Sequence, residues 1–308
     1  MSSLNNTLRH INQSAHDNPA DFVRQCEDRF ARNLDRIATR IAATHGHKLV
    51  LLAGPSGSGK TTCAGMLANR LQTATRQTHL VSLDDFYLPL ERLPVLDDGT
   101  RDIESIHALD LPLLESVLRG LMETGRGDLP SFDFKTGKRG VGQNITLDDD
   151  DLVVVEGLHA LHPLVAGTLA QSKVHVEQIT KMYISVSLRI YDDRWNIVLN
   201  KRNLRLCRRI LRDAQFRNTP ALETLQMWSS VTRGEEQNLA PCKPLADICV
   251  NSIHLYEPCV FRQRLLPMLE QLPEHKEAAR LAHALRRFEV IPEDHTPPQS
   301  LLREFLGA

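Results

Sequence analysis

The stretch GPSGSGKTT, residues 54–62, follows an apolar run and contains residue types that suit phosphate binding. Its spacing fits the pattern G-x-x-x-x-G-K-[ST], with Gly54, Gly59, Lys60 and Thr61 at the fixed positions. Glycines let backbone N–H groups turn inward as a nest for phosphate oxygens, and a helix that begins there adds its positive end. The pattern therefore predicts a site for a nucleoside triphosphate. Its expected members are Gly54, Ser56, Gly57, Ser58, Gly59, Lys60, Thr61 and Thr62.

Two acidic segments follow other apolar runs, SLDDFY at 82–87 and VVVEG at 153–157. Glu156 ends its run, where we expect a Mg²⁺ or water ligand; the alternative is a carboxylate exposed at a strand end. Neighbours on an extended backbone point opposite ways. We therefore expect one of Asp84 and Asp85 to face the γ-phosphate and the other to cap the next turn.

A basic stripe follows in KRNLRLCRRILRDAQFR, residues 201–217. Its arginines fall at helical positions i, i+3, i+4 and i+7: Arg205, Arg208, Arg209 and Arg212. Arg217 lies just beyond, and Asp213 is the one acid of the stretch. A solvated face normally mixes signs, so a stripe of one sign favours a polyanionic ligand. Triphosphate is the preferred candidate, since arginines stabilise the charge that develops during phosphoryl transfer; RNA and simple surface charge are the alternatives.

These side chains need a scaffold, and the apolar runs predict a parallel sheet. Five strand candidates alternate with helical segments: 48–53, 79–83, 152–157, 182–188 and 246–251. Such a pattern is typical of an α/β fold with helices on both faces of the sheet. Ligands of these sheets bind outside the carboxyl ends of the strands, where the glycine-rich loop and both acidic segments are expected.

The flanking segments are expected to support this core. We expect a polar tail at 1–17, followed by an amphipathic helix that starts at Asn18-Pro19. The interval 88–150 is long for a connection and is expected to build an acceptor pocket. The acidic run at 148–151 is interpreted as a solvated loop. From 258 onward, apolar spacing predicts a C-terminal helical layer.

Composition excludes several classes of protein. The chain has 308 residues, is 42% hydrophobic and has a formal net charge of −1, which argues against a general nucleic-acid or membrane-surface binder. No apolar run is long enough for a membrane span, and the N-terminus lacks the apolar centre of a signal peptide. The 6 cysteines are scattered, so we expect reduced thiols and a cytoplasmic protein, with a homo-oligomer left open.

Four motifs in order carry a resemblance to a known family. GPSGSGKTT, SLDDFY, VVVEGLHAL and RLCRRILRD resemble the uridine kinase branch of the P-loop kinases, relatives of phosphoribulokinase and pantothenate kinase. GTRDIESIHALDL, LPSFDFKTGKR, ETLQMWSSVTRGEE, ADICVNSIHLYE and SLLREFLG extend it to the kinase half of longer bacterial proteins, which join a threonyl-tRNA-synthetase-like region to a uridine kinase-like domain. We expect that fused region to be absent here, because the first strand begins near residue 48.

The resemblance implies a P-loop kinase fold with a five-stranded parallel sheet. It implies a kinase domain at 46–255, with an acceptor-site insertion at 88–150 and an arginine-rich lid at 192–240. Residues 1–45 are then a polar tail and an amphipathic helix, and residues 256–308 are a C-terminal helical extension. The implied activity is transfer of the γ-phosphoryl group of ATP, with Mg²⁺, to a nucleoside hydroxyl.

The resemblance also implies roles for single residues. Asp84 is the implied base for the acceptor hydroxyl, and Thr61, Asp84 and Glu156 are the implied Mg²⁺ ligands. Lys60, Arg208 and Arg212 would serve the transferred group, and Arg209 would bind the nucleotide. The implied acceptor-site residues are Tyr87, Glu104, Phe132 and Arg205.

One segment departs from uridine-cytidine kinases, which read the pyrimidine through a Tyr-Asp-Phe-x-x-His pattern. Here Phe132 lacks the hydroxyl and Gly137 lacks the imidazole. We therefore expect a broader nucleoside range or a different acceptor, unless Lys135 or Thr136 compensates or another residue does the reading. Pantothenate, glycerate and sugar phosphates are the alternative acceptors.

Two alternatives to catalysis are weighed. A regulatory GTPase-like switch needs an NKxD segment, and Asn200-Lys201-Arg202-Asn203 lacks the aspartate. A non-catalytic nucleotide-binding module is expected to have lost one of the site's acidic residues or its lysine, whereas Lys60, Asp84 and Glu156 are all present.

Overall fold

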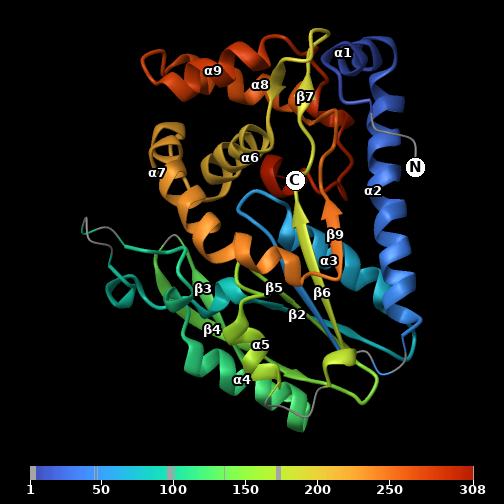
Figure 1. Ribbon diagram of the computed structural model, residues 1–308, viewed down its shortest axis with the longest axis vertical. Helices are drawn as coiled ribbons and strands as arrows, with labels where there is room; N and C mark the ends of the chain where they lie inside the picture. The colour runs from blue at the N-terminus through green and yellow to red at the C-terminus, as the bar shows by residue number, and fades with distance from the viewer. Residues whose placement is uncertain are drawn as a thin grey trace.

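The computed structural model describes residues 5–44, 46, 48–95, 99, 101–134, 136–170 and 175–307, and a five-stranded parallel sheet lies at its centre (Figure 1). The strands are β1 (Leu49–Ala53), β2 (Thr78–Ser82), β5 (Leu152–Glu156), β6 (Ile179–Ser185) and β9 (Ile248–Asn251). Their spatial order is β2-β5-β1-β6-β9, with every neighbouring pair parallel. The expected strands are therefore confirmed. Because β1 is the central strand, the glycine-rich loop that follows it lies at the middle of the edge formed by the carboxyl ends of the strands.

Helices cover both faces of this sheet, as predicted. All five residues of β1 are buried. Successive side chains of a strand point to opposite faces. Leu49, Leu51 and Ala53 pack in the cluster that contains α4 (Leu111–Thr124) and α5 (Pro163–Ala170). Val50 and Leu52 pack in the other cluster, with α2 (Pro19–Ala42) and α3 (Lys60–Leu71).

The N-terminal segment is helical further upstream than we expected. Residues 8–17, assigned above to a polar tail, form α1 (Leu8–Asp17), because Thr7 caps its first turn and Ile11 is buried in the core. The start of α2 is confirmed: Asn18 accepts a hydrogen bond from the amide of Asp21, and Pro19 is the first helical residue. The apolar stripe of α2 is buried along its length: Val23, Cys26, Phe30, Leu34, Ile37 and Ile41.

The interval 88–150 is more regular than a loop. It contains α4 and an antiparallel hairpin of β3 (Arg126–Asp133) and β4 (Lys138–Thr146). Short 3₁₀ turns at Leu83–Phe86, Leu90–Arg92 and Ile106–Ala108 lead into it. The acidic run at 148–151 is not wholly solvated, because Asp151 is buried and accepts hydrogen bonds from two backbone amides.

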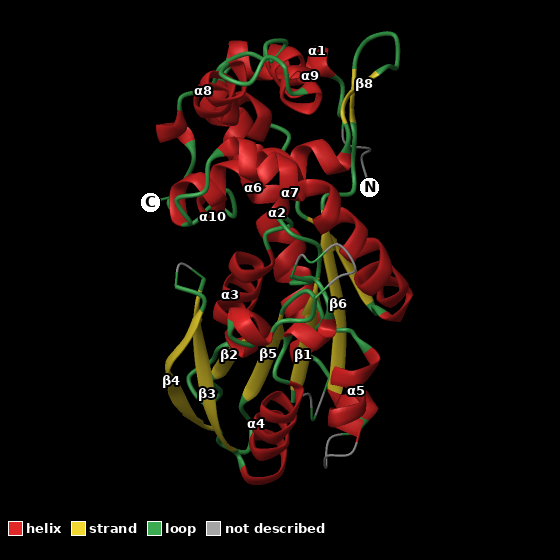
Figure 2. Ribbon diagram, turned by 90° about the vertical axis from the view of Figure 1, so that its left-hand side faces the viewer, coloured by secondary structure: helices red, strands yellow, loops and turns green. Residues whose placement is uncertain are grey.

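A second helical layer lies at the end of the sheet toward which the strands point (Figure 2). A short pair, β7 (Ile190–Tyr191) and β8 (Ile197–Leu199), leads into it. Its helices are α6 (Lys201–Phe216), α7 (Ala221–Gly234), α8 (Glu257–Glu270), α9 (Lys276–Leu285) and α10 (Arg303–Leu306). A π-helical turn (Glu235–Leu239) and 3₁₀ turns at Ala240–Leu245, Val176–Gln178 and Glu293–His295 complete the regular structure. The C-terminal helical layer is thus confirmed.

Two expectations about the chain as a whole can be checked here. Within the described ranges, no helix has the length and apolar content that crossing a membrane requires. The cysteines are all unpaired, and only Cys249 is exposed.

Candidate active site

The glycine-rich loop joins β1 to α3 at the carboxyl end of the sheet. Gly57 and Gly59 have φ values of +70° and +86°, in the left-handed region that favours glycine. These conformations turn the loop back on itself before Lys60 begins the helix. The loop therefore has the backbone that the phosphate-binding pattern predicts.

The loop amides fall into two groups. Within the described part of the chain, the N–H groups of Gly57, Gly59, Lys60 and Thr61 donate to no protein acceptor. They lie at the first turn of α3, where a helix carries partial positive charge. The other amides are occupied: those of Ser56, Ser58 and Thr62 donate to Glu235, Pro55 and Glu304. The open amides form the part of the loop that is ready for an anion.

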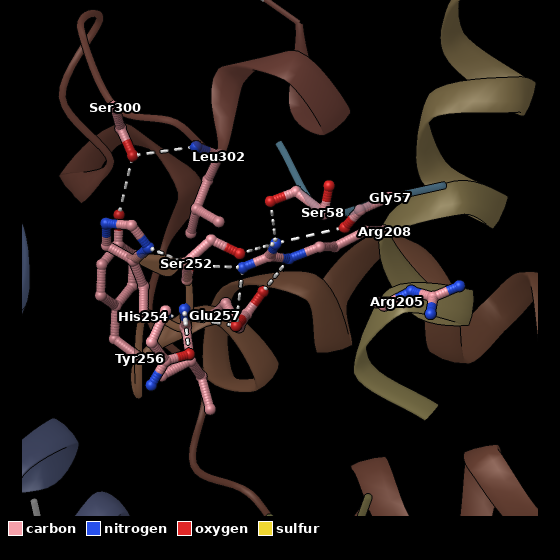
Figure 3. Close-up of polar contacts among 12 residues, drawn as sticks. Gly57, Ser58, Arg205, Arg208, Ser252, His254, Tyr256, Glu257, Ser300 and Leu302 are labelled. Atoms are coloured by element: carbon pink, nitrogen blue, oxygen red, sulfur yellow. Dashed lines mark hydrogen bonds and ion pairs between the residues drawn. The ribbon is translucent and has the colours of Figure 1, made fainter. Parts of the chain in front are cut away.

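Two of the predicted lid arginines, Arg205 and Arg208, contact the opposite, carbonyl side of the loop, and Figure 3 shows the contacts of Arg208. Arg205 donates to the carbonyl of Ser56 and pairs with Glu235. Arg208 is 0% exposed and donates to the carbonyls of Gly57 and Ser58. Neither lines the pocket on the amide side. We expected Arg205 in the acceptor site and Arg208 on the transferred phosphate. The structure places neither there, because the face of α6 that carries them packs directly on the loop.

A pocket on the amide side brings most of the other candidates together. It is lined by Ser56, Lys60, Asp84, Tyr87, Ile103, Glu104, Phe134, Leu158, Arg209, Arg212 and Arg217. Its cavity volume is about 70 Å³, so it is small. The pocket joins the phosphate loop to the β2 acids and to the later part of the arginine stripe.

Asp213 organises the arginines of this pocket. It is buried and pairs with Arg209, Arg212 and Arg217. Arg209 also donates to the hydroxyl of Ser56, at 2.8 Å. One carboxylate thus partly neutralises three guanidinium groups, and the excess positive charge faces Lys60 and the loop. That is the charge pattern expected around a bound polyphosphate.

Glu156 lies where a divalent cation would be held. Its carboxylate accepts hydrogen bonds from the hydroxyls of Thr61 (3.1 Å) and Ser82 (2.8 Å). Burial and the nearby Asp84 raise the pKa of Glu156 to about 7, although Lys60 opposes the shift. A buried carboxylate beside another acid is stabilised in its ionised form by a nearby cation, and Mg²⁺ prefers oxygen ligands of this kind. Thr61, Asp84 and Glu156 therefore fit the predicted magnesium site in donor chemistry.

The two adjacent aspartates diverge, although the backbone there is a 3₁₀ turn and not extended as we expected. Asp84 lines the pocket beside Lys60. Asp85 accepts a hydrogen bond from the amide of Phe132 in β3, at 3.3 Å. Only Asp84 therefore faces the phosphate side, and Asp85 ties the hairpin to the sheet.

Three aromatic rings form a cluster at one end of the pocket. Tyr87, Phe132 and Phe134 have ring centroids 5.1 to 5.8 Å apart. The guanidinium group of Arg217 lies over Phe134, 4.9 Å from its centroid. Phe134 lines the pocket itself, and Phe132 supports it from behind.

Thr136, one of the two residues weighed as replacements for the missing pyrimidine readers, does not line this pocket. Thr136 donates to Asp133, and Lys135 lies outside the described residues. Gly137, with φ +66°, sits in the hairpin turn against Leu90.

Glu104 lines the pocket at its junction with α7. Burial raises its pKa to about 7, partly offset by Arg209, and Glu235 and Asp84 add to the rise. It lies against Gly234, the last residue of α7. Glu104 is thus a half-buried acid near the predicted base, as the acceptor role requires.

Sequence reasoning missed the acids that support the loop. Glu235, Glu257 and Glu304 each contact the loop or an arginine that holds it. They come from three later segments of the chain. Their one sequence signal is indirect, because buried arginines need carboxylate partners and α6 supplies only Asp213.

The chain is similar to several known proteins. The model of the Phosphoribulokinase / Uridine kinase family matches residues 49–256. A uridine kinase of Ureaplasma urealyticum serovar 10 is 27% identical over 203 residues, covering 66% of this chain and 86% of that protein. A uridine kinase of Lactobacillus helveticus is also 27% identical over 203 residues, with 66% and 85% covered. A solved structure described as a possible uridine kinase from Bacillus stearothermophilus has a TM-score of 0.48 and 17% identity, covering 70% of this chain and 96% of that one.

Proposed function

The chain belongs to the phosphoribulokinase/uridine kinase family, and we propose that it transfers the γ-phosphoryl group of ATP to a hydroxyl of a small acceptor, with a nucleoside as the first candidate. In this proposal, segment 88–150 forms the acceptor side and segment 192–240 forms the lid. The uridine kinases that resemble the chain support a nucleoside acceptor.

One observation carries the proposal. Lys60, Asp84 and Arg212 line the same pocket, beside the open amides of the phosphate loop. A cation and free N–H groups suit a polyphosphate, and a carboxylate suits a hydroxyl that must lose its proton. A module that only binds nucleotides would use this carboxylate for Mg²⁺ alone, so turnover of an acceptor distinguishes the two functions.

The pocket suggests how its residues divide the reaction. The open amides and Lys60 would bind and orient the β- and γ-phosphates, and Asp84 would accept the proton of the acceptor hydroxyl. Arg209 and Arg212 would neutralise charge on the transferred group. Mg²⁺, when bound through Thr61, Asp84 and Glu156, would neutralise phosphate charge and help orient the phosphates.

The proposed acceptor end favours a ring-shaped group and offers few hydrogen-bonding groups to recognise the edge of that ring. Tyr87 and Phe134 present aromatic surface on which a base can stack. The hydroxyl of Tyr87 is occupied, since it donates to the carbonyl of Ile103 at 3.0 Å. An apolar slot discriminates less than a site built from hydrogen-bonding groups. We therefore propose a broad nucleoside range, with Glu104 on the ribose hydroxyls.

A screen of acceptors tests this function. ATP consumption would be measured with Mg²⁺ and each of uridine, cytidine, thymidine, adenosine, inosine and guanosine, then with pantothenate, glycerate and sugar phosphates. We expect turnover with several nucleosides and loss of turnover in Lys60→Ala. Turnover with only the non-nucleosides would move the proposal to another acceptor. ATP binding without turnover on any acceptor would indicate a non-catalytic module.

A further inference from the structure

Arg208 is a buried arginine behind the phosphate loop, and all three nitrogens of its guanidinium group donate hydrogen bonds (Figure 3). Its Nε donates to Glu257 at 2.6 Å, and one Nη donates to the carbonyl of Ser252 at 2.8 Å and to Glu257 at 3.1 Å. Its other Nη faces the hydroxyl of Ser252 at 3.1 Å and the carbonyls of Gly57 and Ser58 at 3.2 and 3.4 Å. All of its donors are therefore used inside the protein.

The contacts of Arg208 set the orientation of two peptide groups in the loop. In a planar trans peptide, the carbonyl of one residue and the N–H of the next point in opposite directions. Drawing the carbonyls of Gly57 and Ser58 toward Arg208 therefore turns the N–H groups of Ser58 and Gly59 the other way. The N–H of Ser58 closes a turn with Pro55, and that of Gly59 is one of the open amides.

Arg205 does the same for the preceding peptide. Its Nε holds the carbonyl of Ser56 at 2.9 Å, which turns the N–H of Gly57 to the open side. Arg205 and Arg208 are one turn apart on α6. This face of the helix thus draws three successive loop carbonyls to one side.

Arg208 also joins the loop to three other elements. Glu257 begins α8, Ser252 follows β9, and the ring of Phe305 in α10 lies 5.1 Å from the guanidinium carbon. Arg209 is the next residue of α6 and faces the pocket. A planar guanidinium can meet a carboxylate and carbonyls at once, whereas an ammonium group cannot reproduce this fork.

We propose that Arg208, held by Glu257 and Ser252, is a positioning residue that sets the phosphate-binding amides of the loop and ties their orientation to helix α6. The inference rests on the proposed function, because it assigns the loop to a polyphosphate. It differs from a role in stability alone, which a buried ion pair can also have.

A double substitution separates positioning from stability. Arg208→Met together with Glu257→Leu removes both buried charges, so no unpaired charge remains to destabilise the fold. Arg208→Lys keeps a positive charge opposite Glu257 but loses the planar set of N–H donors that reaches the loop carbonyls. The matched control is Arg202→Met with Glu236→Gln, an exposed ion pair between α6 and the π-helical turn that does not touch the loop.

The measurements are the melting temperature and the dissociation constants of MgATP and MgADP by calorimetry. In both Arg208 variants we expect nucleotide binding to weaken about tenfold or more, the scale of one lost charge-assisted hydrogen bond. We expect the double variant to melt near the wild type, and the control pair to change neither quantity.

Each outcome decides between the roles. Wild-type affinity in either folded Arg208 variant would overturn the positioning role. If the double variant does not fold, Arg208→Lys decides alone, because it retains the charge that faces Glu257. A wild-type protein that binds neither MgATP nor MgADP would overturn the proposed function and this inference together, whereas equal binding by wild type and variants overturns only the inference.

Discussion

Asp84 and Asp85 are consecutive residues whose carboxylates serve different parts of the site. Asp84 lines the pocket beside Lys60, and Asp85 holds the amide of Phe132 in the hairpin. Burial raises the pKa of Asp85, partly opposed by that hydrogen bond. The pair therefore offers a matched comparison between a carboxylate that lines the pocket and one that holds the hairpin.

We predict that Asp84→Asn and Asp85→Asn separate the kinetic constants. Asp84→Asn should lower kcat by about 10²-fold or more, because the acceptor hydroxyl loses its base, with little change in KM for ATP. Asp85→Asn should mainly raise KM for the acceptor, since the amide of Phe132 loses a charged acceptor. Steady-state kinetics with the best acceptor of the screen measures both. A change confined to KM for ATP in Asp84→Asn would place the base elsewhere.

His254 is a buried histidine in the segment that follows β9. It is 0% exposed, and its Nε2 makes no hydrogen bond to the described residues. Burial, with Arg208 and Arg29 nearby, lowers its pKa to about 3. Below pH 6.5 the unfolded chain therefore binds a proton that the folded chain does not, so the free energy of unfolding falls as the pH falls from 6.5 toward 3.

We predict that His254→Asn flattens this acid sensitivity. Each pH unit below about 6.5 should cost the wild type about 1.4 kcal/mol through His254 alone. Asparagine can still donate to the carbonyl of Ser252, the partner of the imidazole Nδ1. Urea unfolding at pH 7.5 and pH 5.0 measures the slope. Equal losses in wild type and variant would show that His254 titrates normally in the fold.

At the scale of single residues, the motifs predicted most of the pocket but not its support. Lys60, Asp84, Arg209 and Arg212 line it, as the spacing and the family resemblance suggested. The arginine spacing predicted one face shared by all four arginines of α6, whereas the structure directs Arg205 and Arg208 to the loop carbonyls and the other two to the pocket. The spacing does not say what packs on Arg205 and Arg208, because this depends on side chains contributed by β9, α8 and α10.

Helix α6 is the element that joins the loop to the pocket. Its arginines divide between two directions: Arg205 and Arg208 contact the loop carbonyls, and Arg209 and Arg212 line the pocket. Because Asp213 is shared by the pocket arginines, their charges stay close together without a bound anion. The helix is therefore arranged for a small polyanion inside the molecule.

We predict that Arg212→Ala lowers kcat strongly and leaves the fold intact, because Arg212 contributes pocket charge and is not part of the apolar core. The control is Arg202→Ala, at the exposed start of the same helix. An RNA-binding stripe would behave differently, since affinity would fall modestly with each lost charge and depend steeply on salt. Strong, salt-sensitive RNA binding with unaltered phosphoryl transfer in Arg212→Ala would overturn the lid assignment.

The regular structure of the insertion before β5, residues 88–150, could not be predicted from the sequence. Its helix and hairpin were expected only as a functional loop. β4 is exposed at all but one of its positions, so it lacks the alternation that marks a half-buried strand. Its pairing depends on β3 and on the left-handed turn at Gly137, whose contacts arise only in the fold.

At the scale of the molecule, segments from both ends of the sequence meet behind the phosphate loop. Glu27 of α2 accepts hydrogen bonds from Ser300 and Tyr256, both at 2.6 Å. Leu301, the next residue, lies so close that a Cβ on Gly59 would come within 2.7 Å of its side chain. Glu304 accepts from the amide of Thr62 at 3.2 Å. The segment around α10 therefore covers the loop from behind, and α2 holds that segment through Glu27.

We predict that Glu304→Gln has opposite effects on stability and on nucleotide binding. The carboxylate stabilises the start of α3 by up to about 1 kcal/mol, so the free protein should melt at a lower temperature. The same negative charge would repel a phosphate at Thr62, so MgATP should bind a few-fold more tightly to the variant. Melting curves and calorimetry measure the two effects.

Glu293→Gln is the control for this prediction, because Glu293 pairs with Arg264 and Arg303 away from the loop. Weaker MgATP binding in Glu304→Gln would show that the carboxylate supports the nucleotide.

The contact between Thr62 and Glu304 joins residues 242 positions apart in the chain. At a synthesis rate of about 5–20 residues per second, the ribosome would make Glu304 on the order of ten to fifty seconds after Thr62. During that time the loop lacks its rear support, and the core surface that Leu301 and Phe305 will cover is exposed. A nascent chain therefore completes its phosphate site late in translation, so chaperone binding during synthesis should concentrate on that uncovered face.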